Sequence, residues 1–175
     1  VVTGVQTCAL PICLSADAAD RLVAFTAARL DHDAVSALRV TFYGGEPLLA
    51  TDRLRFLARR LGDLAASRGK PFRFSLITNG SLLTPKTVDG LLPLGLDRAQ
   101  VTLDGPPRLH DRTRPFRSGG GSFSAILRNL KAVADRLAID LSGNYGPETW
   151  PEFIPLPHLL IEEGLGPDRI AHLRF

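Results

Sequence analysis

Methionine is absent from the whole chain of 175 residues, position 1 included, and cysteine occurs only twice, as Cys8 and Cys13. A natural chain begins with methionine unless it has been processed or shortened, so the start of this one needs an explanation before its cysteines are interpreted. The spacing of the two cysteines fits no standard metal site, and without a secretory signal a disulfide is not expected. The sequence therefore predicts neither a structural zinc site nor a disulfide framework.

Long apolar runs are also absent. The apolar stretches have the length of strands and are broken by Arg or Asp, far short of the roughly 20 residues that a membrane span needs. Hydrophobic residues make up 45% of the chain and charged residues 22%, which is typical of a soluble domain with a real core. We expect one domain, no membrane partner and a cytoplasmic location.

Lysine is scarce, and the net charge of +3 comes almost wholly from arginine. The only lysines are Lys70, Lys86 and Lys131. Abundant Arg, Ala, Gly and Pro indicate a GC-rich coding sequence, and the basic residues are scattered over predicted helices without forming a stripe interleaved with aromatic residues. We therefore expect no nucleic-acid partner.

The first residues of the chain have an unusual origin. Residues 2–12 (VTGVQTCALPI) resemble the conceptual translation of a short-read sequencing adapter over their whole length. The resemblance implies that residues 1–13 are non-native, that Cys8 is an artefact and that Cys13 lies at the junction. Residues 14–175 are then the credible domain, and the missing methionine and abrupt end are expected of a reading frame on an incomplete DNA fragment.

The rest of the chain alternates between strand and helix patterns. Segments rich in β-branched and aromatic residues predict strands at 38–43, 72–78, 99–103, 137–142 and 169–175. Apolar residues at helical spacing, with capping residues in front, predict helices at 15–30, 51–67, 84–92, 122–136 and 152–163. Such alternation predicts a parallel sheet, either doubly wound or closed into a barrel, with ligands at the carboxyl ends of the strands.

The first strand end carries Gly44, Gly45, Glu46 and Pro47. Two glycines remove both Cβ atoms where the chain leaves the sheet, so backbone carbonyls can approach a ligand closely, and the glutamate adds a carboxylate. Together they are suited to cradle an ammonium group. The residues alone leave open a tight turn with a solvated Glu46.

Two further strand ends carry polar residues. Thr78 and Asn79 precede a glycine in a strong turn signal. Thr102 ends the next strand, and Arg114 follows in a basic segment, where a hydroxyl and a forked guanidinium are suited to a carboxylate. His110 in this segment is expected to make a structural hydrogen bond.

These three motifs, in this order, resemble radical SAM enzymes of the peptide- and protein-modifying branch that includes the sulfatase maturases. YGGEPLL resembles the GGEP motif, which implies that Gly44, Gly45, Glu46 and Pro47 bind the amino group of S-adenosylmethionine (SAM). The implied fold is a partial (β/α)6 radical SAM barrel of the TIM type that lacks the first strand and the cluster loop.

The resemblance extends to the other two motifs. TNG resembles the segment after the third barrel strand, which implies that Thr78 and Asn79 line the SAM pocket. The segment from Thr102 to Arg114 resembles S-x-D-G-P…H-D-x-x-R, and both end residues are implied to contact SAM, with Thr in place of the family's Ser. Leu173 is implied to pack against adenine.

The same resemblance implies cofactors and partners. The parent protein would bind a 4Fe-4S cluster through C-x-x-x-C-x-x-C, a motif absent from this chain. It would cleave SAM to a 5′-deoxyadenosyl radical that abstracts hydrogen from a peptide or protein substrate, with flavodoxin or ferredoxin as electron donor. A C-terminal SPASM domain is common in this branch. We expect the chain by itself to be inactive.

Two alternatives remain open from the residues. One is a hydrolase without SAM that uses Glu46 and Asp104 as paired carboxylates at neighbouring strand ends. The other is a binding module without a cluster. Upstream sequence with a cysteine triplet would exclude both.

Overall fold

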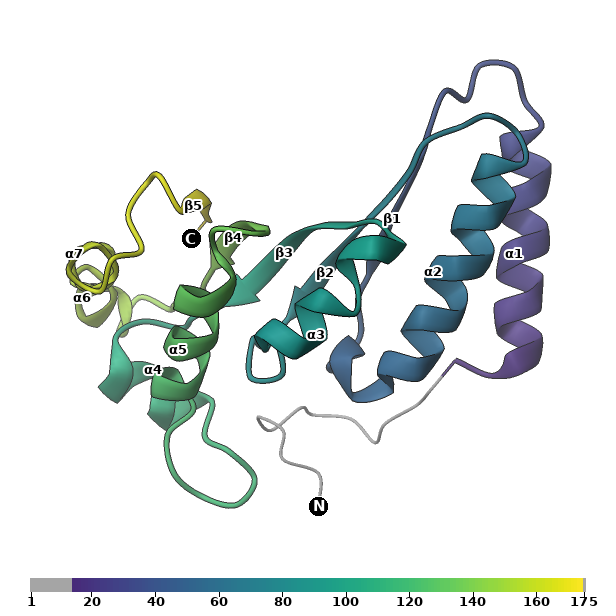
Figure 1. The fold of residues 1–175 in the computed structure, drawn as a ribbon. Helices are drawn as coiled ribbons and strands as arrows, with labels where there is room; N and C mark the ends of the chain where they lie inside the picture. Colours follow the sequence, from purple (N-terminus) through teal and green to yellow (C-terminus); the bar gives the residue numbers. More distant parts are fainter. Residues whose placement is uncertain (1–13, 175) are drawn as a thin grey trace.

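A computed structural model describes residues 14–174; Cys8, Cys13 and the adapter-like segment lie outside the described residues. The strands form one parallel sheet in the order β1-β2-β3-β4-β5 (Figure 1). They are β1 (Leu38–Phe42), β2 (Phe72–Thr78), β3 (Leu96–Thr102), β4 (Ala138–Ser142) and β5 (Ile170–Arg174). Because each strand pairs with the next along the chain, the order never reverses as it does in a doubly wound sheet, and the topology is that of a barrel.

Helices connect the strands and lie along one side of the curved sheet (Figure 1). They are α1 (Ala16–Leu30), η1 (Pro47–Ala50), α2 (Thr51–Ala66), α3 (Pro85–Asp89), η2 (Leu92–Leu94), α4 (Pro107–Thr113), α5 (Phe123–Val133), α6 (Trp150–Phe153) and α7 (Leu156–Glu162). α1 lies beside α2, and contacts between them attach it to the layer. Within residues 14–174, no helix is both long enough and apolar enough to cross a bilayer.

The core lies between the sheet and the helices. In β2 the side chains of Phe72, Phe74 and Leu76 are buried, whereas the alternate residue Arg73 is exposed. This period of two is the pattern of a strand with one buried face. The helices contribute matching apolar stripes, which in α5 consist of Phe123, Ile126, Leu130 and Val133. Each such side chain contributes about 1.5–3 kcal/mol by leaving water.

The other face of the sheet is polar. The hydroxyls of Thr41 and Ser75 lie 2.9 Å apart on β1 and β2. Farther along the sheet, Arg98 Nη1 donates to Asp140 Oδ1 at 2.6 Å. The core side of the sheet therefore holds the fold together, while the opposite face and the strand ends are free to hold polar ligands.

Two predicted boundaries differ from the structure. β3 begins at Leu96, not at residue 99, because pairing with β2 extends it; its polar residues Asp97 and Arg98 hid the strand pattern. The helix predicted at 152–163 is two short helices, α6 and α7, separated at Pro155. A proline has no backbone N–H to continue a helix, but it is accepted at the start of the next one.

One helix was not predicted, and one predicted cap was wrong. The basic segment after β3 contains the helix α4, with Pro107 in its first turn, where a missing N–H costs nothing. Ser122 lies at the N-cap of α5 but makes no side-chain capping bond. Asp111 accepts from Phe123 N at 2.8 Å in its place. The cap comes from the preceding helix, so the local sequence could not reveal it.

Gly143, in the loop after β4, lies tightly against neighbouring residues. A Cβ at this position would lie 2.5 Å from Leu103 O and 2.3 Å from Phe153 Cζ, whereas a Cβ at Gly146 would meet nothing within 4 Å. We predict that Gly143→Ala lowers the free energy of unfolding by about 1–3 kcal/mol, since a backbone oxygen cannot move aside easily. Gly146→Ala is the matched control. Equal urea-unfolding midpoints for the two variants would contradict this packing.

Candidate functional site

Glu46 ties the end of β1 to the end of β2. Its Oε1 accepts from Leu48 N at 3.1 Å and from Thr78 Oγ1 at 2.8 Å. Its Oε2 accepts from Asn79 N at 2.7 Å. The open possibility of a solvated Glu46 is therefore wrong, because the residue is only 7% exposed. The structure brings Glu46, Thr78 and Asn79 together as the sequence predicted.

The Glu46 carboxylate is buried without a cation. No Lys, Arg or His of residues 14–174 forms an ion pair with it. Burial raises the pKa of Glu46 above its ordinary value, although hydrogen bonds from Asn79, Thr78 and Leu48 oppose the rise. A buried negative charge that lacks a positive partner favours the binding of a cation nearby.

Asn79 carries a second unsatisfied group. Its Oδ1 accepts from Ser81 N at 2.9 Å and from Ser81 Oγ at 2.7 Å. Because a backbone N–H can only donate, the side-chain oxygen must face Ser81, and this fixes the orientation of the amide. Asn79 Nδ2 is then a buried donor with no partner among the described residues. Such groups are rare in folded proteins, and a bound ligand or an ordered water can satisfy one.

The space beside the GGEP segment is open. A Cβ built on Gly44 meets nothing within 4 Å, so no packing inside residues 14–174 requires a glycine there. Pro47 begins η1, for which the side chain of Glu46 is the N-cap. A glycine in open space leaves its backbone accessible to a ligand.

Asp104 organises the end of β3. Its Oδ2 accepts from Arg114 Nε, and its Oδ1 accepts from Asn144 N at 2.8 Å. The predicted residue Arg114 is thereby held at the strand ends, with its side chain 29% exposed. Its two terminal nitrogens have no partner among residues 14–174. Arg114 thus has a free fork that can bind a carboxylate.

Thr102 is the last residue of β3 and pairs in register with Ser142 of β4. It shares a face with Gln100, whose side chain donates to Ser142 Oγ at 3.1 Å. The hydroxyl of Thr102 therefore lies on the polar face of the sheet, near the segment that carries Arg114.

His110 of α4 makes the structural hydrogen bonds that were expected. It is fully buried, with Nδ1 3.0 Å from Asp104 N and Nε2 3.0 Å from Ser122 Oγ. Burial lowers the pKa of His110 to about 4, although Asp104 and Asp111 oppose the fall.

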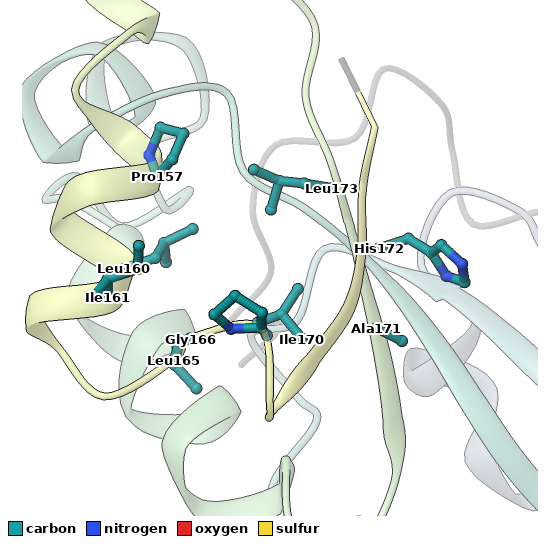
Figure 2. A pocket seen from close by; sticks show the side chains of 10 residues that line it. Pro157, Leu160, Ile161, Leu165, Gly166, Ile170, Ala171, His172 and Leu173 are labelled. Carbon is teal, nitrogen blue, oxygen red and sulfur yellow. The ribbon is translucent and has the colours of Figure 1, made fainter.

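Leu173 lies apart from the other predicted residues. Figure 2 shows it pointing towards α7, in a pocket that it shares with Leu160 and Ile170, while His172 points the opposite way. An irregularity in the pairing of β4 and β5 inserts one residue, Ala171, and places Leu173 opposite Leu141 on the core side. The structure does not bring Leu173 to the polar face, and the sequence carried no signal of the bulge.

The hydrolase alternative fails on geometry. β2 lies between β1 and β3, so Glu46 and Asp104 are not at neighbouring strand ends. Glu46 accepts hydrogen bonds from Thr78 and Asn79. Asp104 accepts from Arg114 and Asn144. The geometry therefore does not favour these two carboxylates as a facing pair of general acid and general base.

Two supporting residues were not predicted. Asn129 of α5 donates to Gly80 O at 2.9 Å and to Ser81 O at 3.0 Å, which anchors the loop that carries Asn79. Asn144 fastens the loop after β4 to Asp104. Both are single polar residues whose partners are distant in sequence, so no local signal marks them. The described part of the chain holds no cluster of three or more His, Cys, Asp or Glu able to bind a metal.

The buried His110 makes stability depend on pH. Its pKa is about 4 in the folded chain against the ordinary 6.5, so the unfolded chain binds the proton more tightly between these values. The stability that the neutral His110 contributes is therefore fully present above about pH 6.5 and is lost as the pH falls towards 4. We predict that the free energy of unfolding of the native chain, relative to His110→Asn, falls by about 3 kcal/mol across this window. A difference that stays flat between pH 7 and 4.5 in urea titrations would contradict it.

Comparisons with known proteins identify relatives of this chain. GTP 3′,8-cyclase 2 of Mycobacterium tuberculosis is 40% identical over 119 residues, which are 66% of this chain and 27% of that protein. PqqA peptide cyclase of Ruegeria pomeroyi is 33% identical over 100 residues, 57% of this chain and 25% of that protein. The chain thus spans about a quarter of the length of these relatives.

A solved structure shares the fold. The structure titled native anSMEcpe with bound AdoMet and Kp18Cys peptide superimposes with a TM-score of 0.73 at 19% identity, over 87% of this chain and 41% of that chain. This confirms the α/β partial-barrel fold class that the sequence predicted. The radical SAM superfamily matches residues 25–152, a range that contains the GGEP segment, Thr78, Asn79, Thr102 and Arg114. Because this match spans most of the chain, the chain belongs to the radical SAM superfamily.

Proposed function

We propose that this chain supplies the SAM-binding part of a radical SAM enzyme, with the amino acid moiety of SAM held between the GGEP segment and Arg114. The observation that carries the proposal is the buried Glu46 carboxylate, which has no cationic partner among residues 14–174 and a raised pKa. A ligand with an ammonium group satisfies it electrostatically.

The residues present fit SAM in two further respects. Asn79 Nδ2 is a buried donor that needs an acceptor, and a SAM oxygen can supply one. Gly44 leaves open space, so a ligand can reach the backbone there. Both features lie where the end of β2 meets the GGEP segment, on the same edge of the sheet as Arg114.

Each residue has a separate task. The negative charge of Glu46 attracts the ammonium group, and the free terminal nitrogens of Arg114 bind the carboxylate. The hydroxyl of Thr102 adds a donor from the neighbouring strand end. SAM held by these residues would supply a 5′-deoxyadenosyl radical for hydrogen abstraction, given a reduced cluster bound by ligands outside residues 14–174.

The cluster needs ligands from elsewhere. Residues 14–174 contain no cysteine, and thiolates are the ligands that such clusters require. The residues described here therefore do not fit the cluster, and we propose that this chain by itself does not catalyse the reaction. We also propose a reduced flavodoxin or ferredoxin as electron donor and the cytoplasm as location, both of which suit an oxygen-sensitive cluster.

A peptide or protein is the substrate that we propose. One relative is named a PqqA peptide cyclase, and anSMEcpe was solved with a peptide. These names describe those proteins, and they support a peptide here only by similarity. A SPASM domain after the barrel, and a native domain that begins at residue 14, belong to the same proposal.

The central prediction concerns the reaction. The chain joined to its native upstream sequence, reconstituted anaerobically with iron and sulfide, should cleave SAM to 5′-deoxyadenosine under a strong reductant. Residues 14–174 alone are the control and should give none, because they lack thiolates. Liquid chromatography with mass detection of 5′-deoxyadenosine measures both. No product from an iron-loaded, reduced full-length enzyme would refute the proposed function.

A second prediction compares the contributions of Arg114 and Arg112 to SAM binding. Arg114→Ala should weaken SAM binding by about 1.5–3 kcal/mol through loss of a charged hydrogen bond. Arg112→Ala is the matched control, since Arg112 is exposed and pairs with Glu152 at 3.2 Å. Calorimetric titration of the reconstituted enzyme with SAM measures both, and equal affinities would remove Arg114 from the site.

A further inference from the structure

The backbone around Arg114 is held by a chain of buried hydrogen bonds. Arg114 follows α4 with φ −133° and ψ 56°, outside any helix or strand. We propose that His110 and Ser122 form a positioning relay that fixes Arg114 so that its free nitrogens meet the carboxylate of SAM. The inference rests on the proposed function and adds two residues to it, neither of which is expected to touch SAM.

The direction of the relay follows from its first donor. Asp104 N lies 3.0 Å from His110 Nδ1. A backbone N–H can only donate, so Nδ1 carries no proton and the neutral ring has its hydrogen on Nε2. Nε2 lies 3.0 Å from Ser122 Oγ and therefore donates to it. The pKa of His110, lowered to about 4 by burial, keeps the ring in this neutral form near pH 7.

Ser122 connects His110 to the backbone of Arg114 by hydrogen bonds. Its oxygen accepts from His110, which leaves its hydrogen for Arg114 O at 2.6 Å. Arg114 N in turn donates to His110 O at 2.7 Å. Both His110 and Ser122 have 0% exposure, so water cannot replace these bonds. The carbonyl and the N–H of Arg114 are thus both tied to the relay.

The side chain of Arg114 returns to Asp104, the residue at which the chain of hydrogen bonds begins. Arg114 Nε donates to Asp104 Oδ2, and the N–H of the same Asp104 begins the chain of bonds to His110. The main chain and the guanidinium of Arg114 are therefore oriented from one point at the end of β3. Only the two terminal nitrogens remain free among the described contacts. An arginine restrained before binding loses less conformational entropy when the ligand arrives.

The test compares two ligands, only one of which carries an amino acid moiety with its carboxylate. S-adenosylhomocysteine carries the amino acid moiety of SAM, and 5′-methylthioadenosine lacks it. In the reconstituted enzyme, Ser122→Ala should raise the Kd of S-adenosylhomocysteine about tenfold, the effect of about 1.4 kcal/mol. The Kd of 5′-methylthioadenosine should change less than twofold. Anaerobic calorimetric titration measures both without reference to turnover.

Graded variants guard against simple unfolding. Ser122→Cys keeps a weaker donor and acceptor of similar size, so its effect should fall between that of the native residue and Ser122→Ala. Asp135→Asn is the matched control just beyond the opposite end of α5, where it weakens an ion pair with Arg169. It should change neither affinity.

The outcomes separate the relay from the proposed function. If Arg114→Ala weakens S-adenosylhomocysteine but both Ser122 variants do not, the relay is overturned and the carboxylate site stands. If the Ser122 variants weaken both ligands equally, their role is general folding and the relay is again overturned. If Arg114→Ala itself has no effect, the carboxylate site fails, and the relay fails with it.

Discussion

A buried carboxylate at the end of β3 is the contact on which this edge of the molecule depends. Asp104 receives Arg114 on one oxygen and Asn144 on the other, and its backbone N–H donates to His110. These bonds join the end of β3 to α4, to the residue that follows α4 and to the loop after β4. Removing one partner from such a network leaves buried groups unsatisfied, which costs more than the bond itself contributes.

Glu46 performs a comparable task two strands away, after β1, with a different electrostatic result. Asp104 is paired with an arginine, whereas Glu46 receives only neutral donors from Leu48, Thr78 and Asn79. One strand end is therefore electrically compensated and offers a free guanidinium, while the other keeps a buried negative charge. An amphoteric ligand with one ammonium and one carboxylate is complementary to this pair, and the amino acid moiety of SAM has that form.

Much of the fold was predictable because it depends on periodicity. The strand at 72–78 and the helix at 51–67 were placed within a residue of β2 and α2, since each carries a clear period and a stop signal. The helix α4 and the division between α6 and α7 were missed, because prolines mark helix starts as well as ends. In the site, Glu46 and Arg114 were found through motifs, whereas Asn129 and Asn144 act on distant partners.

By itself, the sequence determined which residue types end each strand and therefore the superfamily, because the GGEP, TNG and DGP segments are local and ordered. Only the tertiary structure decided what those residues do for one another. It buried Glu46 among hydrogen bonds from two strand ends, and it oriented Arg114 through Asp104. It also turned Leu173 towards α7 through one bulge. The reason is physical: burial and hydrogen bonding depend on neighbours that the chain brings together from positions far apart in sequence.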